Sequence, residues 1–165
     1  MNRLIVLSGV PGSGKSYFSS LLKREKKTHV YIISSDALRA DMLGNQRDLS
    51  EDALMWQIYY ALVRAYSVDP NGIVILDATN AKKQYRLDNI KPFKGLYDQI
   101  DLICFKLDKY LVLRQNKERE FPIPENDLLG LIDAYVLPDE EERKFYHHVD
   151  IITDHEVNSI IKRYL

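Results

Sequence analysis

This sequence of 165 residues has one cysteine, almost no net charge and no long hydrophobic run. Its single cysteine, Cys104, excludes an internal disulfide and a cysteine-based zinc cluster. The formal net charge is -1, so no global positive field attracts long nucleic-acid strands, although a protein that binds strand ends is not excluded. No apolar run approaches the ~20 residues that span a bilayer. The apolar run near the N-terminus is too short for a secretory signal, so we expect a cytoplasmic enzyme without a membrane partner.

The apolar segments predict one α/β domain over residues 1–165. A chain of this length buries roughly 70% of its unfolded surface, which is enough for a core. Short, continuous apolar runs occur at Leu4–Leu7, Val30–Ile33, Ile73–Leu76, Leu102–Leu107 and Val149–Ile152. Such runs are typical of parallel strands that are buried on both faces. We therefore expect a three-layer sandwich with a central parallel sheet and with ligands at the carboxyl ends of the strands.

Helical patterns separate these runs, at Lys15–Lys23, Glu51–Tyr66, Lys82–Ile90, Lys109–Arg119, Glu125–Tyr135 and Glu156–Tyr164. The clearest is 51–66, whose apolar stripe consists of Leu54, Ile58, Ala61, Leu62 and Ala65. The acidic segment 138–144 predicts the solvated start of a further helix. His147 and His148 are interpreted as part of a solvated turn before the last strand, because two histidines alone do not make a metal site.

A glycine-rich motif lies between the first predicted strand and the first predicted helix. Residues 9–16, GVPGSGKS, match the pattern G-x-x-x-x-G-K-[ST] in the context that this pattern requires. Backbone N–H groups of such a loop point at phosphate oxygens, and the helix dipole adds to their field. Lys15 then bridges the β- and γ-phosphates of ATP, and the Ser16 hydroxyl binds Mg²⁺. The predicted cofactor-binding residues are Gly9, Pro11, Gly12, Ser13, Gly14, Lys15, Ser16 and Tyr17.

Polar residues after the second predicted strand indicate where a phosphoryl acceptor would bind. Asp36 follows this strand, and Arg39 lies three residues further on. A carboxylate at this point accepts the proton of an attacking hydroxyl, and an arginine one turn away binds a phosphate of the acceptor. The same residues also fit a second interpretation, in which Ser35 or Asp36 caps a short helix.

The third predicted strand ends in a second polar segment, DATN at 77–80. Asp77 is predicted to act on Mg²⁺, directly or through water. Thr79 and Asn80 either contact a phosphate or cap the helix that starts near Lys82, and from these two residues alone the capping role is favoured.

The motifs, taken in order, resemble the 5′-polynucleotide kinase family. They are the P-loop with GSGKS, S-D-x-x-R at 35–39, D-x-T-N at 77–80 and Arg86 six residues later. The segment LRQNKEREFPIPENDLLGL is similar to the lid of those enzymes, here at about residues 114–124. The family lid reads R-N-x-x-R, whereas this chain has its first arginine one residue early, at Arg114. Arg114 and Arg119 are about 140° apart on a regular helix, so only one of them is expected to reach the phosphates.

The resemblance implies a role for each motif. Lys15, Asp36 and Arg119 are the implied catalytic residues, with Asp36 as general base toward a 5′-hydroxyl and Arg119 offsetting charge on the transferred phosphoryl group. Arg114 joins the implied ATP-binding residues. Arg39 would hold the phosphate on the 3′ side of the acceptor nucleoside. The full set of implied substrate-binding residues is Arg39, Thr79, Asn80 and Arg86.

The sequence thus predicts an ATP- and Mg²⁺-dependent kinase of the 5′-hydroxyl end of RNA or DNA, of the kind that serves nucleic acid repair. Two alternatives stay open. A P-loop kinase of a small metabolite hydroxyl is favoured by the near-zero net charge. A nucleotide-gated binding module without an acceptor is disfavoured by the arginine-rich lid. The sequence decides neither RNA against DNA nor the oligomeric state.

Overall fold

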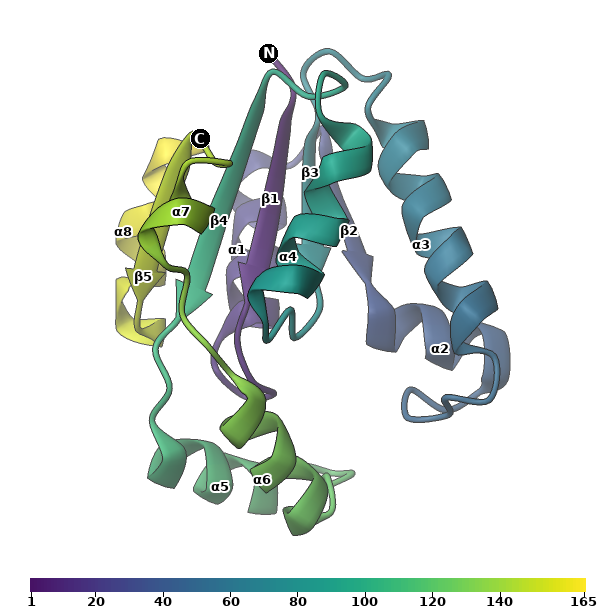
Figure 1. The fold of residues 1–165 in the computed structure, drawn as a ribbon, viewed down its shortest axis with the longest axis vertical. Helices are drawn as coiled ribbons and strands as arrows, with labels where there is room; N and C mark the ends of the chain where they lie inside the picture. The colour runs from purple at the N-terminus through teal and green to yellow at the C-terminus, as the bar shows by residue number, and fades with distance from the viewer.

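A five-stranded parallel sheet forms the centre of the computed structural model, which describes residues 1–165 (Figure 1). The strand order is β2-β3-β1-β4-β5, and every neighbouring pair is parallel. The strands are β1 (Arg3–Ser8), β2 (Val30–Ser34), β3 (Ile73–Asp77), β4 (Gln99–Phe105) and β5 (His148–Ile152). The predicted fold class is confirmed, and each predicted strand is present with ends that differ by a few residues.

Helices cover both faces of the sheet and extend beyond its carboxyl edge (Figure 1). They are α1 (Lys15–Lys26), α2 (Ser35–Leu43), α3 (Asp52–Tyr66), α4 (Lys83–Ile90), α5 (Lys109–Lys117), α6 (Glu125–Ala134), α7 (Glu140–Arg143) and α8 (Val157–Ile160). The predicted helix at 156–164 is instead a series of short turns, because 3₁₀ segments at Asp154–Glu156 and Ile161–Arg163 flank α8. None of these helices combines the length and the apolar character that crossing a membrane requires.

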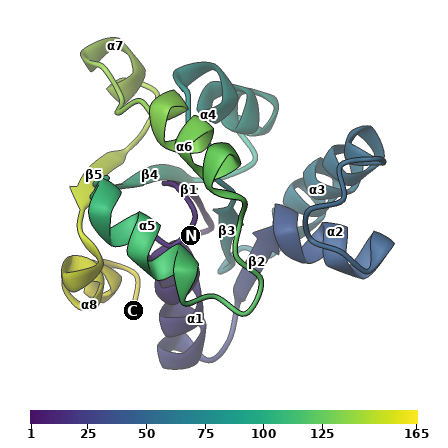
Figure 2. The same ribbon diagram turned by 90° about the horizontal axis from the view of Figure 1, so that it is seen from below.

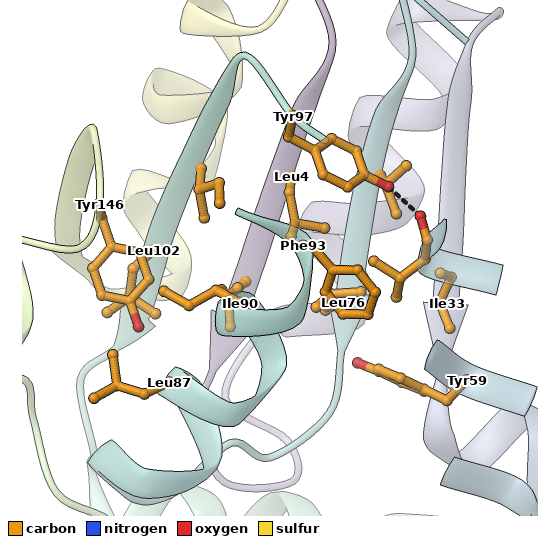
Figure 3. Close-up of a cluster of buried hydrophobic side chains, with 14 of the residues drawn as sticks. Leu4, Ile33, Tyr59, Leu76, Leu87, Ile90, Phe93, Tyr97, Leu102 and Tyr146 are labelled. Carbon is orange, nitrogen blue, oxygen red and sulfur yellow. Dashed lines mark hydrogen bonds between the residues drawn. The ribbon is translucent and has the colours of Figure 1, made fainter. Parts of the chain in front are cut away.

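The central strand β1 is buried on both faces because its side chains alternate between two cores. Leu4 and Val6 point to the core that α3 and α4 cover, where Phe93, Tyr97 and Tyr146 also pack (Figure 3). Ile5 and Leu7 point to the opposite core, against α1 and the C-terminal segment. This position places the end of β1 at the middle of the carboxyl edge.

The buried face of α3 differs from the predicted stripe. Met55, Tyr59 and Val63 are buried, whereas Leu54, in the predicted stripe, is exposed. The buried set repeats every four residues, as the predicted stripe nearly does, but it is rotated by about one residue, or 100°. Burial of the Tyr59 ring favours the observed orientation, because the ring is fully buried in one core with Ile33 of β2 and Leu76 of β3 (Figure 3).

Two helices, α5 and α6, lie beneath the carboxyl ends of the strands (Figure 2). They share a small separate core in which Val112, Leu128 and Ile132 pack against Val10 of the glycine-rich loop. The Tyr135 hydroxyl, just after α6, shares its single proton between the carbonyls of Phe105 (2.7 Å) and Ser8 (3.1 Å). This helical pair contains the predicted lid and is therefore packed directly on the loop that follows β1.

Candidate nucleotide and acceptor site

The glycine-rich loop leaves β1 and leads into the first turn of α1. Gly12 and Gly14 have positive φ angles of 83° and 112°, which a residue with a Cβ rarely adopts, so glycine is required at both positions. Gly14 is the N-cap of α1. Because glycine has no side chain, no cap side chain accepts hydrogen bonds from the first N–H groups of the helix. The loop therefore presents free donors and the positive end of a helix dipole, which together favour an anion.

Lys15 lies folded back into this loop. Its ammonium donates to the carbonyls of Gly9 (2.8 Å) and Val10 (3.1 Å), and the side chain is buried. Burial lowers the pKa of Lys15 to about 8, against the opposing attraction of Asp77 and Asp36. Arg119 from the lid lowers this pKa further, so the positive charges of loop and lid act at the same place.

Ser16 and Asp77 form the candidate magnesium position. The Ser16 hydroxyl donates to the Asp77 carboxylate at 3.1 Å, and burial raises the pKa of Asp77. The structure has no cluster of three or more His, Cys, Asp or Glu side chains that would hold a metal by itself. A hydroxyl beside one carboxylate fits Mg²⁺, since this ion usually takes few protein ligands and completes its shell with phosphates and water.

Two cavities meet at the carboxyl edge of the sheet. The smaller, about 540 Å³, includes Gly12, Lys15, Ser16 and Asp77 in its lining. The larger, about 990 Å³, extends toward α3, α4 and α6. Residues that line both cavities are Pro11, Ser35, Asp36, Gln46, Ala78, Thr79 and Arg119. Asp36 and Arg119 therefore stand where a donor in one cavity would face an acceptor in the other.

The Asp36 side chain projects from the first turn of α2. Ser34 caps this helix, because its hydroxyl accepts from the Ala37 N–H at 3.2 Å, so the alternative that Ser35 or Asp36 acts as the cap is wrong. The Asp36 carboxylate is mostly exposed and accepts one long hydrogen bond from Arg39, at 3.3 Å. No other protein group hydrogen-bonds to this carboxylate and competes with a substrate hydroxyl for its oxygens.

Arg39 is held by a second carboxylate that the sequence does not reveal. Its Nε and Nη2 donate to Asp52 at the start of α3, at 2.8 and 3.2 Å. With the bond to Asp36, three of the five guanidinium N–H groups are in use and two remain for a ligand. The guanidinium lines the larger cavity.

The lid segment is organised by Asn116 at the end of α5. Its side-chain amide donates to the Ile123 carbonyl at 2.8 Å, and its oxygen accepts from the Ile123 N–H at 2.9 Å. Arg119, just past the helix, lines both cavities, whereas Arg114 is exposed on α5 and lines neither. The two arginines thus point in different directions, as their spacing on a helix predicts. Gln115, in the place of the family's first lid arginine, lines the smaller cavity beside Gly12.

Arg47, which belongs to none of the motifs, forms a hydrogen-bonded bridge between two loops beside the larger cavity. Its guanidinium donates to the carbonyls of Phe121 and Pro122, the latter at 2.7 Å, and so joins the α2–α3 loop to the α5–α6 loop. We call this bridge the Arg47 clasp. Only a contact between segments 74 residues apart reveals it, so no local sequence signal could have predicted it.

A family model described as an AAA domain matches residues 4–138, a range that includes most of β1, the glycine-rich loop, Asp36 and the lid. The chain belongs to this family. Protein kti12 of Schizosaccharomyces pombe is 29% identical to this AAA domain over 147 residues, which are 82% of this chain and 52% of that protein. The chain therefore spans about half the length of this curated relative.

Solved structures share the fold of this AAA domain. Chaetomium thermophilum Kti12 in complex with ADP-AlF3 superposes with a TM-score of 0.73 at 19% identity, over 97% of this chain and 96% of that one. A chain of the Pnkp1/Rnl/Hen1 RNA repair complex gives 0.69 at 21% identity, over 88% and 46%. Mycobacterium tuberculosis APS kinase CysC in complex with AMPPNP and APS gives 0.67 at 15% identity, over 98% and 96%. The domain thus has the fold of P-loop kinases.

Two residues implied as substrate ligands have structural roles instead. Arg86 on α4 is fully buried and donates through Nε and Nη2 to both Glu142 oxygens, at 2.6 and 2.8 Å. Its Nη1 donates to the carbonyls of Asn80 and Val136, at 3.1 and 2.8 Å. A buried arginine with these partners has no face for a substrate, so its predicted role is wrong. In the acidic segment, Asp139, Glu140 and Glu141 are exposed as predicted, and only the carboxylate of Glu142 is buried.

Asn80 is the second correction. Its side-chain amide donates to the Leu7 carbonyl at 2.8 Å, and its oxygen accepts from Asn89 of α4. The residue is buried with a φ of 46°, a conformation that asparagine tolerates better than most residues. It therefore shapes the turn after β3. Thr79, which lines both cavities, keeps its place among the candidate ligands.

His147 and His148 are exposed at the start of β5, as predicted, and each also has a partner on β4. The Nδ1 of His148 lies 3.0 Å from an oxygen of the fully buried Asp101, and Nδ1 of His147 accepts from the Ile100 N–H at 3.0 Å. Both rings thus contact β4 at the edge of the sheet opposite the cavities.

Removing one partner of the Arg86–Glu142 pair is expected to destabilise the domain strongly. Arg86→Met leaves the Glu142 carboxylate buried without its partner, at an expected cost of about 3–5 kcal/mol in urea denaturation. The double variant Arg86→Met/Glu142→Leu should recover most of this loss. Lys83→Met on the same helix breaks exposed ion pairs with Asp139 and Glu141 and serves as the control, with little expected change. Equal losses in Arg86→Met and the control would contradict the structural role.

The depressed pKa of Lys15 predicts that ATP binding weakens as the pH rises through 8. Only the ammonium form attracts phosphates, and in the free protein this form is lost above the pKa of about 8. Between pH 8 and 9 the affinity should fall by up to about tenfold, with proton uptake on binding in calorimetry. In Lys15→Met the affinity should be lower at every pH and the slope absent. An unchanged slope in that variant would assign the titration to another group.

Proposed function

We propose that this protein transfers the γ-phosphoryl group of ATP to the 5′-hydroxyl end of a nucleic acid. The observation that carries the proposal is the position of Asp36. Its carboxylate is exposed and lies at the border of the two cavities. A carboxylate there is within the reach of both sites, and a general base must be close to the hydroxyl that attacks. A switch or hydrolase without an acceptor has no use for a second cavity of about 990 Å³ beside the first.

The donor side of this proposal rests on the glycine-rich loop. Lys15 and the loop N–H groups bind the phosphates of ATP, and Ser16 and Asp77 would hold Mg²⁺, which would supply further positive charge to the phosphates. Arg119 adds positive charge from the lid, which favours the transferred group as its charge spreads in the transition state. The complexes of Kti12 with ADP-AlF3 and of APS kinase with AMPPNP support a nucleotide in this loop.

The acceptor side rests on Asp36 and Arg39. Asp36 accepts the proton of the hydroxyl, and the two free N–H groups of Arg39 bind the phosphate on the 3′ side of the acceptor nucleoside. The likeness to a chain of an RNA repair complex supports a nucleic-acid end as the acceptor.

A nucleotide-dependent binding module is the second candidate, because the Kti12 structure holds ADP-AlF3 and is described without a phosphoryl acceptor. In that case the larger cavity would hold a partner that is not phosphorylated. A small-metabolite kinase would use the same Asp36 but would not need a phosphate at Arg39.

Asp36→Asn tests whether transfer occurs. Loss of a general base should lower kcat by roughly 10²–10⁴-fold and leave the affinity for ATP nearly unchanged. The measurement is label transfer from γ-labelled ATP to an oligonucleotide with a 5′-hydroxyl, with the 5′-phosphorylated oligonucleotide as the blank. Asp41→Asn on the same helix, outside both cavities, is the matched control. If the wild type labels no oligonucleotide, the proposed function is wrong, and the binding module and the small-metabolite kinase remain.

Arg39→Ala tests which acceptor is used. Charge-assisted contacts of this kind correspond to about ten- to a hundredfold in kcat/KM for a nucleoside 3′-monophosphate. The loss on the matching nucleoside, which lacks the phosphate, should be small. Asp52→Asn, which loosens Arg39 without removing it, should give an intermediate loss. Equal losses on both acceptors would show that Arg39 only positions Asp36, and would favour a small-metabolite kinase.

A further inference from the structure

The larger cavity has an aromatic wall that the proposed chemistry does not use. Trp56 and Tyr60 project into its lining from α3, and Tyr85 does so from α4. The smaller cavity has Tyr17 as its single aromatic lining residue. Aromatic side chains are thus concentrated on the side where the acceptor is proposed to bind.

The wall is held rigidly from behind. The Trp56 ring packs edge-on against buried Tyr59 with centroids 4.9 Å apart, and lies at 29° to the Tyr60 ring with centroids 6.0 Å apart. The Tyr60 hydroxyl donates to the Asn89 side chain at 2.9 Å, and Asn89 bonds in turn to Asn80. Because these contacts fix both rings before a ligand arrives, stacking on them costs little conformational entropy.

The charges around the wall fit a nucleotide. The cavity lining has four cationic side chains, Arg39, Arg47, Lys82 and Arg119, and three acidic ones, Asp36, Asp88 and Asp127. Asp36 is the proposed base, and Asp88 accepts a hydrogen bond from Gln84 at 2.7 Å. A ligand with a flat ring, a phosphate and a hydroxyl would therefore find a partner for each part.

We propose that Trp56 and Tyr60 are the stacking wall for the nucleobase of the acceptor nucleotide, and that the site takes a single-stranded end. This inference rests on the proposed function. Stacking on a side chain is available to every base, so no base preference is expected. A base inside a duplex is already stacked and paired, and bringing it to the wall requires unstacking. The Arg47 clasp joins two loops beside the same cavity, and a single strand passes such a bridge more easily than a duplex does.

Fluorescence of Trp56 tests the wall without any phosphoryl transfer, since Trp56 is the only tryptophan of the chain. The probe is a short single-stranded oligonucleotide with a 5′-hydroxyl, and its matched control carries an abasic first nucleotide. We expect the probe to change the emission of Trp56 and to bind about 10- to 100-fold more tightly than the abasic control. Equal affinities without a change in emission would overturn the proposal. A blunt duplex that binds as tightly as the single strand would overturn its single-strand part.

Variants of Tyr60 separate the ring from its hydroxyl. Tyr60→Leu should remove most of the preference over the abasic control, whereas Tyr60→Phe should keep it, because the stacking face is retained. Tyr110→Leu is the matched control, since this tyrosine is exposed on α5 and lines neither cavity. If Tyr60→Leu does not fold, the abasic substitution in the wild-type experiment still tests the wall.

The same oligonucleotides distinguish failure of the wall from failure of the kinase. Discrimination by fluorescence without label transfer supports the stacking wall and removes the proposed kinase activity. Label transfer at equal kcat/KM to the normal and the abasic end removes the wall and leaves the kinase in place.

Discussion

The hydrogen bonding of residues 7–9, where β1 leaves the sheet, is the constraint on which the site depends. Buried backbone groups need partners, and at this point the neighbouring strands no longer supply all of them. Asn80 donates to the Leu7 carbonyl, Tyr135 to that of Ser8, and Lys15 to that of Gly9, while the Gly9 N–H donates to the Thr79 carbonyl. The turn after β3, the base of the lid and the first turn of α1 are therefore all fixed against one short segment.

The sequence predicts the parts of the fold that depend on local pattern. Continuous apolar runs identify each strand, because a strand buried on both faces needs no alternation. The face of α3 could not be predicted in the same way. Leu54 and Ile58 recur at the same helical spacing as Met55 and Tyr59, and periodicity treats the two sets almost alike. Packing against the sheet decides between the two sets, because burial of a bulky ring such as Tyr59 stabilises the fold more than burial of the small alanines in the predicted stripe.

In the candidate site, too, local patterns predict some residues correctly, whereas roles that depend on tertiary contacts are not predicted. The glycine-rich loop, Asp36 and Arg119 come together as expected because each follows a strand or helix end at the carboxyl edge. The predicted substrate-binding roles of Arg86 and Asn80 are wrong, because a motif does not show which distant residue a polar side chain will contact. Arg86 meets Glu142, which lies 56 residues later in a segment whose composition suggests a solvated helix. Only the tertiary structure brings such pairs together.

The same reasoning limits what net charge says about a ligand. The chain as a whole has a charge of -1, yet cationic groups from α2, the α2–α3 loop, the turn before α4 and the lid line one cavity. At a Debye length of about 8–10 Å, a bound nucleotide responds to these groups and hardly to the rest of the surface. In the proposed reaction, the glycine-rich loop would select the donor, and the walls of the larger cavity would select the acceptor. Asp36 lines both cavities, so in the proposed reaction it would accept the hydroxyl proton only when donor and acceptor are both bound.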